Sequence, residues 1–404
     1  MLGLERIRDA TIWRIYAVTL LVGLAYGISI SLTAIQLDES GFDKEAIGTL
    51  AACFASGLVL FSMPMGWLIR KLSAQRVLTY ALVGYAASVA VFPWLSSYTA
   101  LAAVRFIDGA CSVAVWVSCE TIILSRSQAH HKAFTTSLYA VALAVGYVMG
   151  PLLSRVVVSV APLSAAFALA GALSLGGALY VRLCVARDAT EHHHPAGSIS
   201  GGLDSGPALL WKIKNSCFAT FAYGYFQATV VLFLPLYLME SKNITREQTI
   251  VIPAFFAAGM LLFSNFAGRA GDRYGHLFIM RWLAVVGATM ILGFVFLDAY
   301  VWMCVAVFTA GASLATISPV SLALQSVQCE PSQYGRATGL YNMFYAGGIL
   351  LGPPVASRLF EQHGGKLMLY HLVALWAAFI VFSLLFARDD PHAAPSFAPA
   401  RSVD

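Results

Sequence analysis

The stretch TSLYAVALAVGYVMGP at residues 136–151 returns 202 positions later, at residues 338–353, as TGLYNMFYAGGILLGP. The same offset relates Gly66 to Gly268, and the register between these points runs without a gap. Internal repeats of this kind build two related bundles and place a site at the seam between them. The repeat therefore predicts a duplicated fold whose working residues face that seam.

The composition of the chain is that of a membrane protein. Hydrophobic residues make up 59% and charged residues 11% of its 404 residues, and the mean hydropathy is +0.75. Soluble domains contain roughly 45–50% apolar and about 25% charged residues. The net charge of +5 comes from basic residues in short loops between apolar runs, so membrane topology explains it and nucleic-acid binding does not.

Apolar runs long enough to cross a bilayer, about 20 helical residues each, recur along the chain. The first of them is too long for a cleaved signal peptide. We expect about twelve spans, six in each half: 12–37, 45–69, 76–97, 98–125, 134–160, 162–186, 209–238, 247–267, 276–298, 299–326, 337–360 and 366–387.

These spans predict an all-α membrane protein made of two pseudo-symmetric six-helix bundles. Its predicted parts are an N-terminal bundle at 1–187, a linker at 188–208, a C-terminal bundle at 209–388 and a tail at 389–404. The linker is rich in Gly, Ser and His and is expected to be a flexible tether, and the Ala- and Pro-rich tail is expected to be disordered. A bare run of three histidines in the linker lacks shaping partners, so no metal site is predicted.

Lysine and arginine gather in the loops on the side of the two termini and the linker. The positive-inside rule therefore predicts that the termini and the linker are cytoplasmic, as in a multi-pass protein of a bacterial inner membrane. The seven cysteines have no paired spacing, and we interpret them as small apolar residues rather than disulfides or metal ligands.

The loop after the eighth predicted span reads GRAGDRYG, residues 268–275. Gly268 and Gly275 permit a close helix approach and a tight turn, while Asp272 can neutralise a helix N-terminus and Arg273 can brace it. This loop resembles the cytoplasmic signature of the major facilitator superfamily. The resemblance implies a twelve-helix transporter that works by alternating access, with no cofactor.

The first-half copy of this loop departs from the pattern, because Arg70 stands where the superfamily has Asp. In the superfamily that Asp is thought to close the cytoplasmic side by capping a helix of the other half. Arg70 would repel the same positive helix end. We therefore expect an asymmetric gate. The first-half loop with Gly66 and Arg70 cannot make the closing contact, whereas Asp272 can make it with the start of the fifth span near Phe134.

Three charged residues, Arg105, Asp108 and Glu120, lie inside the fourth predicted span, where charges are costly and face a cavity or a partner. Asp108 follows Arg105 by one helical turn and can pair with it. The stretch resembles a motif that the superfamily links to proton coupling. The alternative is a structural ion pair that joins two helices. Residues expected on the same helical face are Arg105, Asp108, Ser112, Trp116, Cys119 and Glu120.

Glu120 lies roughly 22 Å along the helix from Arg105 and cannot join that pair. It suits an inner gate or an exposed mouth as well as a proton site. The second-half counterparts of the three charges are Val307, Ala310 and Leu322, which are apolar. Ion coupling is therefore predicted to lie in the first half.

Gly146, Gly150 and Pro151 in the fifth span resemble the Gly-Pro motif that the superfamily associates with antiporters of the drug-efflux type. Glycine lets helices touch, and proline frees a carbonyl group. Gly352 and Pro353 repeat the motif in the eleventh span. A motif present in both halves can also be a hinge inherited by duplication, which weakens the inference of export.

Polar-tipped aromatic and amide side chains interrupt several spans, and such groups suit amphipathic organic solutes. Ordinary helix packing is the alternative for each of them. The predicted cavity residues are Tyr26, Gln36, Trp116, Tyr139, Tyr147, Tyr223, Gln227, Tyr341, Asn342 and Tyr345.

We therefore expect a proton-coupled antiporter that exports a small amphipathic organic molecule, such as a drug-like compound. Residues 116–121 also resemble siderophore exporters of the superfamily. The alternatives are a proton symporter that imports a sugar or organic acid, and a non-transporting sensor or assembly factor. The expected partners are a small solute, protons and the lipid bilayer. A monomer without enzymatic activity, nucleic-acid partner, cofactor or metal is expected.

Overall fold

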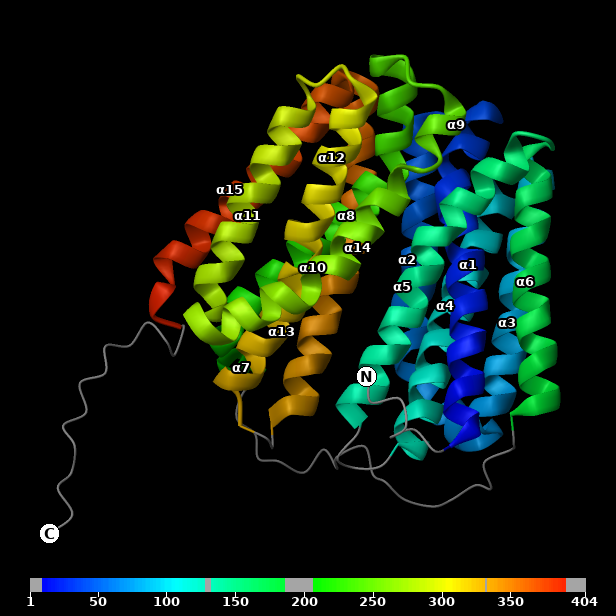
Figure 1. Cartoon of the computed structure of the whole chain (residues 1–404), viewed down its shortest axis with the longest axis horizontal. Coiled ribbons are helices and arrows are strands. Elements are labelled where there is room, and N and C mark those ends of the chain that lie inside the picture. Colours follow the sequence, from blue (N-terminus) through cyan, green and yellow to red (C-terminus); the bar gives the residue numbers. More distant parts are fainter. Residues whose placement is uncertain (1–8, 128–131, 186–205, 331–332, 390–404) are drawn as a thin grey trace, which may run out of the picture.

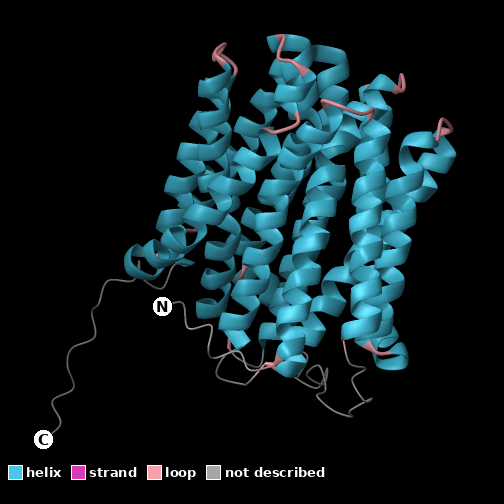
Figure 2. Ribbon diagram, turned by 45° about the vertical axis from the view of Figure 1, so that its right-hand side comes forward, coloured by secondary structure: helices cyan, strands magenta, loops and turns pink. Residues whose placement is uncertain are grey.

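The computed structural model of the chain describes residues 9–127, 132–185, 206–330 and 333–389, and these are almost entirely helical (Figures 1 and 2). Most of the predicted linker, with its histidine run, and nearly all of the predicted tail lie outside these ranges. Predictions about those segments are therefore not addressed by the structure.

The first half contains six long helices. The first two begin after polar N-cap residues. The side chain of Asp9 accepts a hydrogen bond from the Thr11 N–H, and that of Asp43 accepts one from the Ala46 N–H. These helices are α1 (Ala10–Glu39), α2 (Lys44–Leu72), α3 (Ala74–Val91), α4 (Tyr98–Arg126), α5 (Lys132–Val158) and α6 (Leu163–Cys184).

The second half repeats this order, with short helices added at its start and after its first long helix. Its helices are α7 (Gly206–Lys212), α8 (Lys214–Lys242), α9 (Arg246–Thr249), α10 (Ile252–Tyr274), α11 (His276–Phe294), α12 (Tyr300–Ala310), α13 (Ile317–Gln328), α14 (Tyr334–His363) and α15 (Gly365–Leu385). A π-helical turn, Gly311–Ala315, joins α12 to α13, so the tenth predicted span is one interrupted rod.

Eleven stretches of the described chain are helical, long and apolar enough to cross a membrane. The predicted span 337–360 is not among them. It corresponds to α14, a 30-residue helix that contains Pro353 and Pro354 and is less apolar than its neighbours. The all-helical membrane fold is confirmed, while the predicted count of twelve exceeds by one the spans that composition alone supports.

The sequence repeat holds in three dimensions. A Cβ atom on Gly57 would lie 2.1 Å from the carbonyl oxygen of Phe106, so α2 and α4 touch through their backbones. Gly259 and Phe308, which are 202 positions further on, have the same relation at 2.1 Å between α10 and α12. Glycine at this register lets two helices approach more closely than any side chain would allow.

The Gly-Pro positions lie at the closest helix crossings. A Cβ atom on Gly146 would lie 2.5 Å from the backbone of Gly23, and one on Gly150 would lie 2.6 Å from Gly27, so α5 packs directly on α1. In the second half, Gly352 meets the backbone of α8 in the same way. Helices α5 and α14 both continue through their prolines. These glycines therefore have a packing role. That the Gly-Pro positions also act as hinges stays a prediction.

The two halves lean together at one end of the molecule and separate toward the other (Figure 1). The most extensive contacts across the seam are α2 with α14, α5 with α10, and α1 with α8. We call the end where α1 begins the terminal end, and the end where α9 lies the far end. The halves therefore meet at the far end.

Candidate functional site

Arg105 and Asp108 form a buried ion pair on α4. The Arg105 Nη1 atom lies 2.6 Å from Asp108 Oδ2, and their side chains are 15% and 8% exposed. Ser112 donates to the other carboxylate oxygen of Asp108 at 3.4 Å. The guanidinium group also lies 4.5 Å from the centre of the Phe54 ring, a cation–π distance. Both interpretations of the pair, proton site and structural connection, are compatible with this geometry.

Two N–H donors on α4, one within this pair and one two turns further along the helix, have no hydrogen-bond partner among the described residues. They are Arg105 Nε and Trp116 Nε1, and both atoms are buried. An unpaired buried donor loses the hydrogen bonds it would make in water, at a typical cost of about 1–3 kcal/mol. These unpaired donors do not stabilise the fold, so their presence needs another reason. A polar solute that accepts hydrogen bonds from them would provide that reason.

An aromatic cluster from four helices surrounds Tyr26 of α1. The ring of Tyr26 lies 4.5 Å from Tyr85, 5.8 Å from Trp116 and 6.3 Å from Tyr147, measured between ring centres. The Tyr85 hydroxyl lies 3.0 Å from Ser29 Oγ. Sequence reasoning missed Tyr85. It is a tyrosine among small residues in the third predicted span, which is the signal that could have found it.

A matching cluster lies in the second half. Tyr223 of α8 and Tyr345 of α14 stack with ring centres 5.9 Å apart and planes 22° apart. The Tyr345 hydroxyl donates to Gln227 Oε1 at 2.9 Å. Tyr341 instead has its hydroxyl 3.0 Å from Ser321 Oγ on α13, so it belongs to the packing of its own half.

The two clusters lie near each other at the seam. Tyr147 of α5 lies within electrostatic range of both Tyr223 and Tyr345. Helices α1 and α8, which carry Tyr26 and Tyr223, also pack against each other. The structure therefore gathers most of the predicted cavity aromatics around the place where the halves join.

Four predicted site residues lie away from this group. Gln36 is near the far end, where its Nε2 donates to Ser40 at 3.2 Å. Tyr139 is buried and lies within electrostatic range of Glu120, while Glu120 and Asn342 are exposed on their helices. Glu120 is thus separate from the Arg105–Asp108 pair, in the manner expected from its distance along α4.

At the terminal end, the side chain of Asp272 is 73% exposed, and its Oδ1 lies 3.2 Å from His276 Nε2. The Arg273 guanidinium lies 5.2 Å over the Tyr274 ring. The side chains of Arg70 and Phe134 lie outside the described part of the structure, as does the surface of Gly66. The proposed action of Asp272 on the start of α5 therefore stays a prediction.

Of the two glycines at the ends of this loop, only Gly275 occupies a position that requires glycine. Gly275 has φ 98°, a conformation that L side chains rarely adopt. Its first-half counterpart, Ser73, has φ 77° and ψ 148° without being glycine. A Cβ atom on Gly268 would meet nothing within 4 Å, so no close helix approach requires that residue here.

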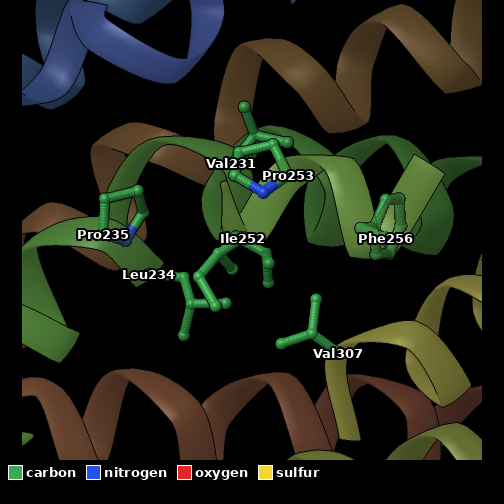
Figure 3. Close-up of a pocket in the computed structure, with 8 residues that line it drawn as sticks. Val231, Leu234, Pro235, Ile252, Pro253, Phe256 and Val307 are labelled. Carbon is green, nitrogen blue, oxygen red and sulfur yellow. The ribbon is translucent and has the colours of Figure 1, made fainter. Parts of the chain in front are cut away.

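Small apolar cavities lie in the second bundle. Figure 3 shows Leu234, Ile252 and Val307 around one of them. An adjoining cavity of about 30 Å³ is lined by Val307 and Ala310, the counterparts of Arg105 and Asp108. Where the first half holds an ion pair, the second half holds an apolar space. Neither cavity offers polar groups to a solute, so the candidate site remains at the seam.

Comparison with known proteins agrees with this architecture. Residues 15–214 and 216–403 match the Major Facilitator Superfamily, and the chain belongs to that family. An uncharacterised MFS-type transporter, YcaD of Salmonella heidelberg, is 24% identical over 384 residues, which cover 92% of this chain and 95% of that one. YcaD of Salmonella agona matches to the same extent.

Solved structures share the fold. A mutant of the nucleoside transporter NupG superposes with a TM-score of 0.80 at 16% identity, covering 94% of this chain and 99% of NupG. A bacterial homologue of the human lysosomal transporter Spinster, in an inward-facing and occupied conformation, gives 0.75 at 12% identity, with 97% and 99% coverage. Its membership of the Major Facilitator Superfamily makes the chain a multi-pass membrane transporter and not an enzyme.

Proposed function

We propose that the protein is a proton-coupled antiporter that exports a small amphipathic organic molecule by alternating access. The observation that carries this proposal is the buried Arg105–Asp108 pair, which lies within a membrane-spanning helix of one half only. Ionisable groups inside a membrane are rare and mark ion and proton pathways. The aromatic cluster around Tyr26 and its counterpart in the second half supply apolar faces and hydroxyl groups for an amphipathic solute.

The orientation we propose places the terminal end in the cytoplasm. Support comes from the gathering of lysine and arginine at that end, as the positive-inside rule requires. We count α14 as the twelfth span, because it packs along both α2 and α8 between helices that qualify as spans themselves. With this orientation the bundles separate toward the cytoplasm, which is an inward-facing state.

Asp108 is proposed to exchange a proton for the solute. As a carboxylate it pairs with Arg105, which is the arrangement in this inward-facing state. Protonation from the outside would remove the negative charge, weaken the pair and leave Arg105 without a counter-charge. Release of the proton to the cytoplasm would restore the pair when the solute is taken up at the seam.

Tyr26, Trp116 and Tyr147 of the first half and Tyr223 and Tyr345 of the second are proposed to contact the solute. Contacts from both halves let a bound solute bias the relative position of the bundles. A drug-like compound or a siderophore fits this description. Family membership favours such a transporter over a sensor or assembly factor.

A proton symporter that imports a metabolite is the second candidate. Two tyrosine pairs at the seam, Tyr26 with Tyr147 and Tyr223 with Tyr345, each have planes 22° apart. Such pairs also suit a flat polar ring, and the nucleoside transporter NupG shares the fold. Direction of transport separates this candidate from the first.

Everted membrane vesicles carrying a pH-sensitive dye test the proposal directly. An acid interior is imposed, and amphipathic solutes are added one at a time. Solute-driven loss of the gradient is expected for the parent protein and not for Asp108→Asn, because an amide cannot carry the exchanged proton. Asp298→Asn is the matched control, because this far-end carboxylate is 91% exposed and should be dispensable.

Two outcomes would contradict the proposal. A gradient response that persists undiminished in Asp108→Asn would remove Asp108 from coupling. Accumulation of a metabolite in right-side-out cells, with no solute-driven proton movement in everted vesicles, would favour the symporter.

A further inference from the structure

A lysine of the first half is held by three groups of the second half at the far end. Lys44 begins α2, and its Nζ lies 2.7 Å from Glu240 Oε1 and 4.0 Å from Glu361 Oε2. The ammonium group also lies 5.0 Å from the centre of the Phe360 ring. The Lys44 side chain is only 17% exposed, so this contact is partly shielded from water.

The backbone of α2 takes part in the same contact. Glu361 accepts a hydrogen bond at 3.1 Å from the N–H of Lys44, one of the N-terminal donors that an α-helix leaves unpaired. A carboxylate at this position also faces the positive end of the helix dipole. Beside it, Gln362 donates to Glu45 Oε1 at 3.3 Å. Helix α14 thus caps a helix of the other half.

A second ion pair crosses the seam at the same end. Arg246 Nη1, on the short helix α9, lies 2.8 Å from Glu39 Oε1 at the end of α1. Beneath the ion pairs, a Cβ atom on Gly48 would lie 2.8 Å from the carbonyl oxygen of Pro353, so α2 and α14 touch closely. Polar and backbone contacts therefore close the far end together.

Two ion pairs of the described residues at the terminal end each join residues of one half. Arg126 pairs with Asp9 at 3.4 Å in the first half, and Lys214 pairs with Asp389 at 2.5 Å in the second. Such pairs stiffen each bundle but do not oppose its movement relative to the other. The cross-half ion pairs described at the far end do oppose it.

We propose that Lys44 and Arg246, with Glu39, Glu240 and Glu361, form a far-end latch that stabilises the state closed at this end. Opening of the far end requires all the cross-half pairs to break together. The latch rests on the proposed function only in that it assumes alternating access. It acts on the equilibrium between the two states and not on the proton site at Asp108.

The expected effect of each pair is modest, because partly exposed ion pairs are weak. Loss of one pair should raise the ratio of far-end-open to far-end-closed molecules by about 2- to 5-fold. Loss of both should raise it further, and high salt should have the same direction of effect in the parent protein.

Spin labels on the far-end loops measure this ratio. Ser96 of the first half and Ala299 of the second are exposed, and each is replaced by cysteine in a full-length background without the native cysteines. Pulsed electron resonance then reports the distance distribution between the labels. Lys44→Ala, Arg246→Ala and the double variant should shift population toward longer distances.

Two further variants make the test specific. Lys242→Ala removes a far-end lysine whose partners, Asp298 at 2.9 Å and the Val295 carbonyl, lie in its own half, so its distances should match the parent. Lys44→Arg keeps the charge and should stay closed. Melting temperature and gel filtration establish that every variant is folded.

An unchanged distance distribution in the folded Lys44→Ala/Arg246→Ala variant would overturn the latch. In that case a response lost in Asp108→Asn would still support the proposed antiport. Conversely, a latch seen by distance without any solute-driven proton movement would leave the latch standing and remove the proposed function.

Discussion

Arg105 and Asp108 show which contacts of a side chain in a membrane helix can be predicted from the sequence. Their spacing of one turn made the pairing predictable from the sequence, and the 2.6 Å contact is present. The Phe54 ring under the guanidinium group, and the lack of a partner for Arg105 Nε among the described residues, could not be predicted, because both depend on how α2 packs against α4. A side chain's partners on its own helix follow from periodicity, and those on other helices do not.

Ser73 gives a prediction at the residue scale. It adopts a backbone conformation reserved almost entirely for glycine, which costs about 1–3 kcal/mol in other residues. Ser73→Gly should therefore stabilise the protein by about 1 kcal/mol after the entropy cost of glycine is subtracted. Thermal unfolding in detergent measures the change.

The control is Asn243→Gly. Asn243 has φ 51° in the left-handed region, which asparagine tolerates, so this change should have little effect. An equal or lower melting temperature for Ser73→Gly than for the parent would show that the backbone at position 73 is not strained.

At the scale of elements, glycine determines which helices cross closely. Helices α1 and α5 meet through Gly23 and Gly146 and through Gly27 and Gly150, with no side chain between them. The Gly-Pro pattern in the sequence pointed to Gly146 and Gly150 in the fifth predicted span and to Gly352 in the eleventh, but not to Gly23 and Gly27 in the first. It did not reveal which helix each glycine faces, because a transmembrane helix is apolar on all sides and offers no amphipathic stripe to read.

Gly150→Ala tests this crossing. The new methyl group would lie 2.6 Å from the backbone of Gly27, and such overpacking typically costs about 1–3 kcal/mol. Unfolding in detergent should reveal the loss. Gly268→Ala is the matched control on α10, since its methyl group would meet nothing within 4 Å. Equal stability of the two variants would rule out a packing role for Gly150.

For the whole molecule, the two ends are expected to oppose each other. The far-end latch is closed in this structure, while Asp272 at the terminal end is exposed and contacts His276 at the start of α11, in its own half. If Asp272 closes the terminal end when the far end opens, its loss should disfavour the far-end-open state.

Asp272→Asn should thus lower the population of long far-end distances, in the opposite direction to Lys44→Ala. The clearest comparison introduces Asp272→Asn into the Lys44→Ala/Arg246→Ala background, where the far-end-open state is most populated. A distance distribution that does not move toward the closed state would show that Asp272 has no part in the gate.

The membrane class, the duplicated halves, the extent of most helices and the location of the ionisable pair were predictable from the amino-acid sequence. These follow from hydropathy, helical periodicity and a repeat, which are local or directly comparable properties of the chain. Which end of the molecule is closed depends on how the two bundles pack, and the same packing brings Lys44 to Glu240 and Glu361. Residues that are some 200 or 300 positions apart meet because two bundles lean on each other, and no local pattern encodes that angle.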